Sequence, residues 1–346
     1  MFKKILIGLS IIIAILIAGY FYLINSGIQL PEETDAIIEE VLEAGELPEL
    51  IKGETGFAEN GGVKIWYEKI VPQDSIHGTI LLIMGHSSSA MIWGPEFTNP
   101  LVDAGYQVIR YDNRGVGESD WMTNWDAANP YTLEDMAKDG IAVLDAAGVD
   151  KAHIAGASMG GMIAQRVALS HSERVLSLTS IMSSGYMNDP EMPALNTTKM
   201  LDFLRLSLRY LMPPSEAGGI KFMVGIQQLF QGKGPYRHPI KKSAETTLYE
   251  LRKRKGRNAN VGDQHTAAIG ASGSRLEELG NIKMPTLIIH GKSDPLVRFE
   301  HCEKYAPLIP HAKKLFIDGM GHDMPTIYME QYHTAILDII GSNTAL

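Results

Sequence analysis

From Gly62 onward, short apolar runs alternate with stretches of helical periodicity, and this alternation restricts the fold more than any other feature of the sequence. Several runs are almost continuously apolar, which is typical of strands in a parallel sheet covered on both faces. The pattern predicts an α/β fold with a mostly parallel, doubly wound central sheet between helices. The expected strands are Val63–Tyr67, Thr79–Met84, Gln107–Tyr111, Ala152–Ala155, Leu176–Met182, Thr286–His290 and Lys314–Ile317.

The alternation stops between about Ser184 and Leu279, where Met- and Leu-rich helical patterns occur without a convincing strand. We interpret residues 184–279 as a helical cap inserted over the carboxyl ends of the strands. Residues 57–183 and 280–346 are then the two parts of one core domain. Within the first part, a helix is expected over Leu133–Ala147, because Thr132 and Asp135 resemble a capping box and Gly148 follows the helix.

The amino terminus is apolar and uncharged from Ile5 to Ile24, with Lys3 and Lys4 before it. Twenty residues at about 1.5 Å each match the roughly 30 Å of membrane hydrocarbon. We therefore expect a transmembrane anchor over residues 1–27 and an acidic linker over residues 28–56. The positive-inside rule places the amino terminus in the cytoplasm and the catalytic domain on the extracytoplasmic side. The alternative is a signal peptide, which would be cleaved on secretion.

Composition excludes several classes of protein. A chain of 346 residues that is 45% hydrophobic can bury a substantial core. Its single cysteine, Cys302, allows neither an internal disulfide nor a cysteine-based zinc cluster. The net charge of −9 argues against nucleic acid as a partner. No metal or dinucleotide motif occurs, so we predict no metal and no organic cofactor.

The most informative motif is Gly156-Ala157-Ser158-Met159-Gly160, which directly follows an expected strand and precedes a helical pattern. This is the context of a nucleophile elbow, where a strained turn projects a serine above the sheet. A Cβ at Gly156 or Gly160 would collide with neighbouring backbone. The motif alone is weak, because a Gly-rich turn between strand and helix can produce it, so a base and an acid must also be found.

Both are present. Asp294 follows the strand Thr286–His290, and His322 follows the strand Lys314–Ile317. The order Ser, Asp, His, with each residue after a strand, is the one expected for a triad on such a sheet. We predict that His322 removes the proton from Ser158 and that Asp294 fixes the tautomer of His322.

A tetrahedral intermediate also needs preorganised hydrogen-bond donors. One donor should be the backbone amide of Met159, the residue after the nucleophile. The other should come from the loop after Thr79–Met84, and we select the backbone amide of His86 rather than its imidazole.

Together these motifs resemble the α/β-hydrolase superfamily from about Phe57 to Pro325. Within it, the chain resembles the serine esterase group that includes aclacinomycin methylesterase and the cofactor-free haloperoxidase-like hydrolases. The resemblance implies the same triad and oxyanion residues, and a structural role for Asp112 and Arg114. The segments that carry it are Leu82–Gly85, Tyr111–Ser119, Gly156–Gly161, Ile289–Gly291 with Asp294–Leu296, and Gly319–Asp323.

The expected function is hydrolysis of a small-molecule carboxylic ester, small to medium in size and apolar, through an acyl-enzyme intermediate. A perhydrolase, a carbon–carbon bond hydrolase and a membrane-surface lipase would share the triad. A catalytically silent hydrolase fold used for binding is the alternative from a different class. The membrane, reached through the amino-terminal helix, is the other expected partner, and no oligomeric state is predicted.

Overall fold

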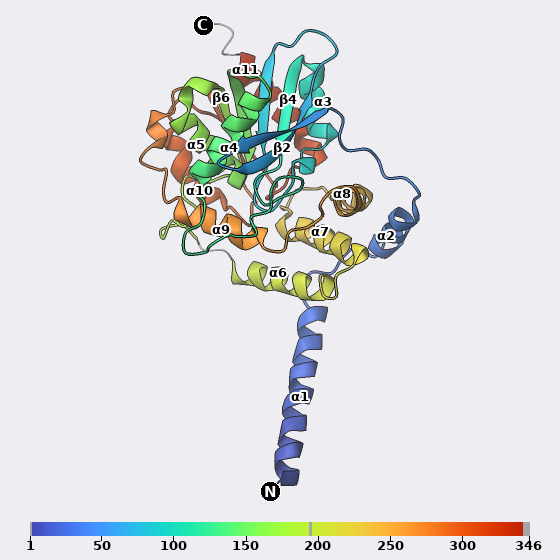
Figure 1. Ribbon diagram of the computed structural model, residues 1–346. Helices are drawn as coiled ribbons and strands as arrows, with labels where there is room; N and C mark the ends of the chain where they lie inside the picture. The colour runs from blue at the N-terminus through green and yellow to red at the C-terminus, as the bar shows by residue number, and fades with distance from the viewer. Residues whose placement is uncertain (1, 194–195, 342–346) are drawn as a thin grey trace. The chain divides into compact units, whose positions relative to one another are not determined.

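The computed structural model of the protein describes residues 2–193 and 196–341, with the side chains of the first helix described from Leu9 onward. Residues 1, 194–195 and 342–346, which belong to the expected segments 1–27, 184–279 and 280–346, lie outside the described residues. The chain divides into two compact units (Figure 1). We call Met1–Leu47, Leu195–Phe230 and His238–Leu248 the helical unit, and Pro48–Ala194, Gln231–Arg237 and Tyr249–Leu346 the sheet unit.

The sheet unit contains one sheet with the strand order β1-β2-β4-β3-β5-β6-β7-β8. β1 pairs with β2, and β2 with β4, in antiparallel register, whereas every pair from β4 to β8 is parallel. The predicted α/β class with a mostly parallel sheet is confirmed. The strands are β1 (Glu54–Asn60), β2 (Val63–Ile70), β3 (Gly78–Ile83), β4 (Tyr106–Tyr111), β5 (Ala152–Ala157), β6 (Val175–Ile181), β7 (Thr286–Gly291) and β8 (Lys313–Ile317).

β1 is the strand that the sequence pattern does not predict. It begins at Glu54, and among its side chains only Ala58 is buried. An edge strand that buries one small side chain lacks the apolar run by which strands are recognised. It is held instead by its hairpin with β2, whose register runs from Glu54 opposite Lys69 to Asn60 opposite Val63.

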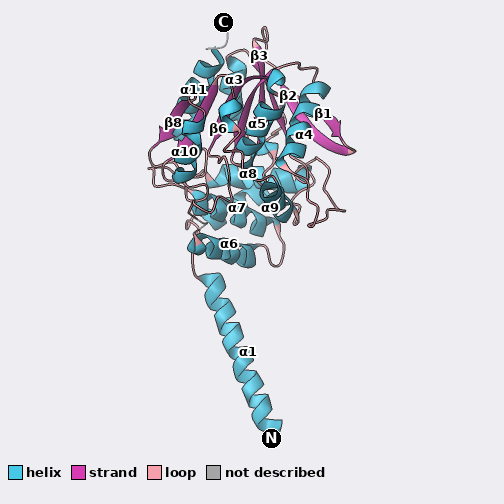
Figure 2. Ribbon diagram, turned by 90° about the vertical axis from the view of Figure 1, so that its left-hand side faces the viewer, coloured by secondary structure: helices cyan, strands magenta, loops and turns pink. Residues whose placement is uncertain are grey.

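Helices cover both faces of this sheet (Figure 2). Side chains alternate along a strand, so Ile80 and Leu82 of β3 join one core cluster while Leu81 and Ile83 join the other. The first cluster includes α3 and α11, and the second includes α4, α5 and α10. The helices of the sheet unit are α3 (Pro95–Asp103), α4 (Leu133–Ala146), α5 (Met159–Ser170), α9 (Val261–Ala271), α10 (Phe299–Tyr305) and α11 (Met329–Gly341).

Helix α4 begins and ends as its sequence predicts. The Thr132 side chain accepts a hydrogen bond from the Asp135 amide, and the Asp135 side chain accepts one from the Thr132 amide. This capping box satisfies two amides that have no partner inside the helix. Gly148, just beyond the helix, has a φ of +72°, the left-handed conformation that stops a helix and favours glycine.

The helical unit has its own small core. Ile38 of α2 packs in one cluster with Ile220 of α7 and Leu248 of α8, and Leu206 of α6 packs with Leu229 of α7. α8 continues past Leu248 into residues that belong to the sheet unit. The helices that contribute to this unit are α1 (Phe2–Asn25), α2 (Thr34–Glu43), α6 (Thr197–Tyr210), α7 (Glu216–Phe230) and α8 (Ile240–Lys253).

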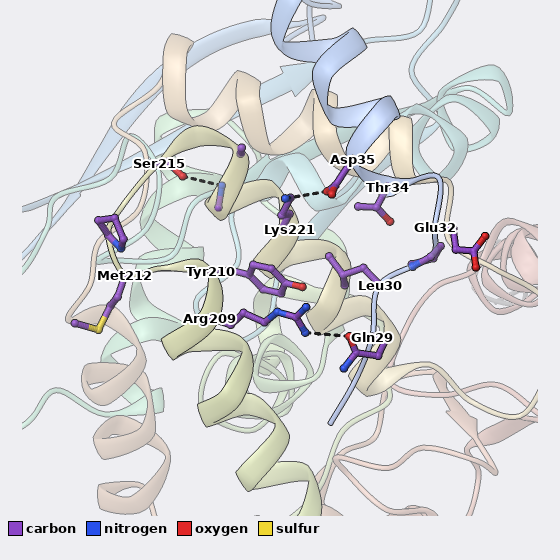
Figure 3. A pocket seen from close by; sticks show the side chains of 14 residues that line it. Gln29, Leu30, Glu32, Thr34, Asp35, Arg209, Tyr210, Met212, Ser215 and Lys221 are labelled. Atoms are coloured by element: carbon purple, nitrogen blue, oxygen red, sulfur yellow. Dashed lines mark hydrogen bonds and ion pairs between the residues drawn. The ribbon is translucent and has the colours of Figure 1, made fainter. Parts of the chain in front are cut away.

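A polar pocket of about 560 Å³ lies within the helical unit (Figure 3). Arg209 donates a hydrogen bond to the Gln29 side chain at 3.1 Å, and Lys221 forms an ion pair with Asp35 at 2.8 Å. The ion pair joins α7 to α2, and the hydrogen bond joins α6 to the segment that follows α1. These contacts supplement the apolar packing of the unit.

The prediction of a transmembrane anchor over residues 1–27 is wrong. Within the described part of the chain, no helix is both long and apolar enough to cross a membrane. A helix, α1, does form over Phe2–Asn25, but it does not meet the requirement for a span. The predicted localisation, with the catalytic domain across a membrane from the amino terminus, rested on that anchor and is wrong with it.

Candidate active site

Ser158 occupies the sharp turn between β5 and α5. Its φ of 57° and ψ of −122° are unusual for a residue with a side chain. Such a conformation costs on the order of 1–3 kcal/mol and persists only where the surroundings fix it. Here the Ser158 amide donates to the Ile181 carbonyl at 2.9 Å, and the Ser158 carbonyl accepts from the Ser183 hydroxyl at 2.8 Å.

The two glycines of the motif are needed for the reason that the sequence predicts. A Cβ at Gly156 would collide with the backbone carbonyl of Gly160, and a Cβ at Gly160 would collide with the carbonyl of Ile83. The strand, the turn and the helix therefore pack backbone against backbone. This close packing holds α5 with its amino-terminal amides beside Ser158.

His322 lies between Ser158 and Asp294. Its Nε2 is 2.9 Å from the Ser158 hydroxyl oxygen, and its Nδ1 is 2.8 Å from Asp294 Oδ2. A carboxylate only accepts, so Nδ1 carries the proton, and the lone pair of Nε2 is left to accept from the serine. The His322 side chain is 9% exposed and that of Asp294 is fully buried. The structure thus brings together the three residues that the sequence selected.

The Asp294 carboxylate is held in one orientation by its own loop. Its Oδ1 accepts hydrogen bonds from the amides of Leu296 at 2.8 Å and Val297 at 2.9 Å. Oδ2 is thereby directed toward His322. A second ring, His290, lies 3.6 Å from Oδ2, but its Nε2 donates to the Val297 carbonyl at 2.8 Å. Burial lowers the pKa of His290, so this ring stays neutral beside the carboxylate.

Two other carboxylates near His322 in sequence have different partners. Asp318 forms an ion pair with Lys292 at 3.0 Å, and its side chain is 86% exposed. Asp323 accepts a hydrogen bond from the Tyr236 hydroxyl at 2.8 Å. Neither is placed as Asp294 is, directly against His322 Nδ1.

The loop after β3 lies directly against the serine. A Cβ built on Gly85 would be 3.0 Å from Ser158 Cβ and 3.5 Å from its hydroxyl oxygen. Among the described residues, no acceptor takes a hydrogen bond from the backbone amide of His86 or of Met159. The two amides that the sequence selected as oxyanion donors thus belong to the residue after Ser158 and to the residue after Gly85, and neither is engaged by an acceptor among the described residues.

The His86 imidazole is engaged by helix α9. Its Nε2 is 2.9 Å from the Gly262 carbonyl and 3.0 Å from the Thr266 hydroxyl. The next amide, that of Ser87, donates to Nδ1 of His265 at 3.0 Å, and Nε2 of His265 contacts the Arg114 carbonyl at 3.0 Å. Burial lowers the pKa of His265 to about 3, so it is a neutral ring that can accept from Ser87.

Buried ion pairs brace the loop that follows β4. Arg114 forms a bidentate pair with Asp139 at 2.6 and 2.7 Å. Asp112 accepts from the amides of Ala90 at 2.8 Å and Glu118 at 2.9 Å, and forms a short ion pair with Arg254. Asp112 and Arg114 thus have the structural contacts that the resemblance implied.

Two residues of this neighbourhood, His265 and Tyr236, were not found from the sequence. His265 lies on α9, and Tyr236 lies in the segment between α7 and α8. Neither belongs to a recognisable motif, because their partners are distant in sequence and are brought to them by the fold. Among the described residues, no group of three or more His, Cys, Asp or Glu side chains is arranged to hold a metal ion.

Comparison with known proteins agrees with this architecture. A family model described as the alpha/beta hydrolase fold matches residues 78–325. A rhodomycin D methylesterase of Streptomyces sp. (strain C5) is 32% identical over 294 residues, which cover 79% of this chain and 94% of the relative. The rhodomycin D methylesterase of Streptomyces peucetius is 31% identical over 300 residues, with coverage of 80% and 95%.

A solved structure of a membrane phospholipase A has a TM-score of 0.62 and covers 98% of this chain and 99% of that chain. Its sequence identity of 22% shows likeness of fold alone. The matched family model and the methylesterase relatives together show that the chain belongs to the α/β hydrolase family. It is a hydrolase, and two of its relatives are named as methylesterases, in agreement with the resemblance.

Proposed function

We propose that the protein is a serine hydrolase that cleaves carboxylic esters of small to medium apolar substrates through an acyl-enzyme intermediate. The observation that carries this proposal is the hydrogen-bond chain from the Ser158 hydroxyl through His322 to Asp294, with distances of 2.9 and 2.8 Å. A serine hydroxyl is a weak nucleophile by itself, and a neighbouring base oriented by a third group is what activates it.

In the acylation step, Ser158 Oγ attacks the ester carbonyl carbon while its proton passes to Nε2 of His322. The imidazolium that forms is stabilised by the negative charge of Asp294. The tetrahedral intermediate then collapses, and the carbon–alkoxy bond breaks. The departing alkoxide takes the proton from Nε2 and leaves as the alcohol, so the acyl group remains on Ser158.

In the deacylation step, a water molecule attacks the acyl carbon and gives its proton to Nε2 of His322. The second tetrahedral intermediate expels Ser158 Oγ, which recovers a proton from Nε2, and the carboxylic acid is released. We assign the oxyanion of both intermediates to the amides of His86 and Met159. The positive end of α5, which begins at Met159, adds to this stabilisation.

We further propose that residues 249–279, a part of the expected cap that belongs to the sheet unit together with the triad, contribute to selection of the ester. Helix α9 in this segment holds the His86 side chain through Gly262 and Thr266. Changes in α9 would therefore affect both the shape of the site and the oxyanion loop. Because two relatives are methylesterases, a methyl ester is the first type of ester to test.

The test uses the full chain with p-nitrophenyl esters of increasing acyl length and with a methyl ester. We expect Ser158→Ala to lose more than about a thousandfold of turnover, because residues that act as a unit fail together. Ser170→Ala is the matched control, since Ser170 lies on the same helix and donates to Glu134 on an exposed surface. Residual turnover by Ser158→Ala above about a tenth of wild type would exclude Ser158 as the nucleophile. No turnover of any ester by the folded wild type would refute the ester class.

A further inference from the structure

The segment between α7 and α8 packs directly onto the loop that carries His322. The Gly234 amide donates to the Gly319 carbonyl at 2.7 Å. A Cβ at Gly232 would lie 2.2 Å from the Gly319 carbonyl oxygen and 2.4 Å from the Gly321 nitrogen, so only glycine fits at this position. Both glycines are absent from the motifs that identify the triad. Residues 231–237 thus form a backbone support for the His322 loop.

Tyr236 completes this support through its phenol oxygen. The hydroxyl donates to the Asp323 carboxylate, with Oδ1 at 2.8 Å and Oδ2 at 2.9 Å. The same oxygen accepts from the amides of Gly321 and Gly232, each at 3.1 Å. Asp323 Oδ1 also accepts from the Gly321 amide at 3.1 Å. One phenol oxygen therefore ties down the residue before His322 and the residue after it.

The environment keeps the phenol a donor. Tyr236 is 7% exposed, and its ring meets the ring of Tyr328 edge-on with centroids 5.8 Å apart. Burial and the charge of Asp323 raise the pKa of Tyr236 well above its ordinary value, so its proton is retained at any ordinary pH. The Asp323 carboxylate is in turn directed to Tyr236 and to the Gly321 amide.

We propose that Tyr236 is a positioning residue for catalysis: it clamps Gly321 and Asp323, and thereby fixes the His322 ring between Ser158 and Asp294. Tyr236 acts through the loop and touches none of the reacting atoms in the proposed mechanism. Proton transfer is sensitive to misplacement of this kind, since a displacement of about 1 Å can cost on the order of a hundredfold in rate. The inference rests on the proposed function of His322.

The experiment compares wild type with Tyr236→Phe in the full chain, because phenylalanine keeps the buried ring and removes only the hydroxyl. The matched control is Tyr305→Phe, because Tyr305 is also a buried tyrosine and its hydroxyl lies 3.2 Å from that of Ser180, away from the His322 loop. For each variant, kcat and KM on a p-nitrophenyl ester and the thermal midpoint are measured. We expect Tyr236→Phe to lower kcat by about tenfold or more with KM within about twofold, and Tyr305→Phe to leave both unchanged.

A double-mutant cycle with Asp323→Ala separates positioning from general weakening of the fold. If Tyr236 acts through Asp323, the double variant should lose no more kcat than the more affected single variant. Additive losses, an unchanged kcat in Tyr236→Phe, or equal losses in Tyr236→Phe and Tyr305→Phe would each overturn the proposal. If the proposed serine hydrolase function itself is wrong, Ser158→Ala will retain full activity. That result distinguishes failure of the proposed function from failure of the role assigned to Tyr236.

Discussion

Replacing Asp294 by asparagine should reverse the proton arrangement of the site without changing its shape. Asp294 Oδ1 accepts from two backbone amides, those of Leu296 and Val297, at 2.8 and 2.9 Å. An asparagine must place its carbonyl oxygen there, because an NH₂ group would oppose two donors. Its NH₂ group then occupies the Oδ2 position and donates to Nδ1 of His322.

The size of the effect follows from the tautomer. With Nδ1 of His322 forced to accept, the proton moves to Nε2, which would then donate to Ser158 instead of taking its proton. Loss of this arrangement typically costs about 10⁴ in kcat, or about 5.5 kcal/mol in the barrier. The fold should be unaffected, since asparagine has nearly the same volume as aspartate.

The assay is steady-state hydrolysis of a p-nitrophenyl ester by Asp294→Asn, with the thermal midpoint as a check on folding. Asp318→Asn is the control, because Asp318 lies on the His322 loop, is 86% exposed and forms an ion pair with Lys292. We expect the control to behave as wild type. A folded Asp294→Asn enzyme with a kcat within about tenfold of wild type would refute the tautomer argument.

Two further predictions concern stability. Arg254→Met should lower the free energy of unfolding by about 3–5 kcal/mol, because it leaves Asp112 buried without its cation. The control Lys253→Met replaces an exposed side chain and should change this free energy little. Urea unfolding measures both variants, and equal effects would contradict the prediction. Burial lowers the folded pKa of His265 to about 3 from about 6.5 when unfolded. Between these two pKa values the His265 side chain is protonated in the unfolded chain but not in the folded one. The free energy of unfolding is therefore highest above about pH 6.5 and falls as the pH is lowered below it. When the pH is lowered from about 7.5 to about 5, the free energy of unfolding of the wild type should fall by about 2 kcal/mol more than that of His265→Gln. Glutamine is chosen because its amide oxygen can still accept the hydrogen bond from the Ser87 amide. The same pH dependence in both proteins would show that His265 is not the cause.

The positions of Ser158, Asp294 and His322 could be predicted because each follows a strand. The carboxyl ends of parallel strands meet at one edge of a sheet, so three loops far apart in sequence meet at one place. The glycines of the elbow could be predicted for a similar reason, because the turn admits no Cβ. In both cases a local pattern and a general rule of topology were sufficient.

Other features depend on contacts that no local pattern contains. Basic side chains in a run such as Arg252–Arg257 are mostly exposed in proteins, yet Arg254 is buried against Asp112 and its guanidinium carbon lies 4.5 Å from the centre of the Trp66 ring. Charge spacing does not show which side chain of a basic run turns inward. Tyr236 is similar, since its partner Asp323 is recognised only when the fold brings the two segments together.

The amino-terminal helix is a case in which the sequence pattern led to a wrong prediction. The run from Ile5 to Ile24 is apolar enough by composition to suggest a membrane span, and a helix does form over Phe2–Asn25. Hydropathy counted along the sequence identifies the helix, but it does not establish a span, and no helix in the described part of the chain meets the requirement for one.

The central claim is that Ser158 is the residue that becomes acylated, and labelling with a fluorophosphonate tests it most directly. The reagent reacts with a serine only when a base activates it, and the adduct is stable enough for peptide mass spectrometry. We predict stoichiometric labelling of the peptide that carries Ser158, complete loss of esterase activity in step with labelling, and no labelling of folded Ser158→Ala. Inactivation with the label on another residue, or esterase activity that survives full labelling of Ser158, would contradict the account.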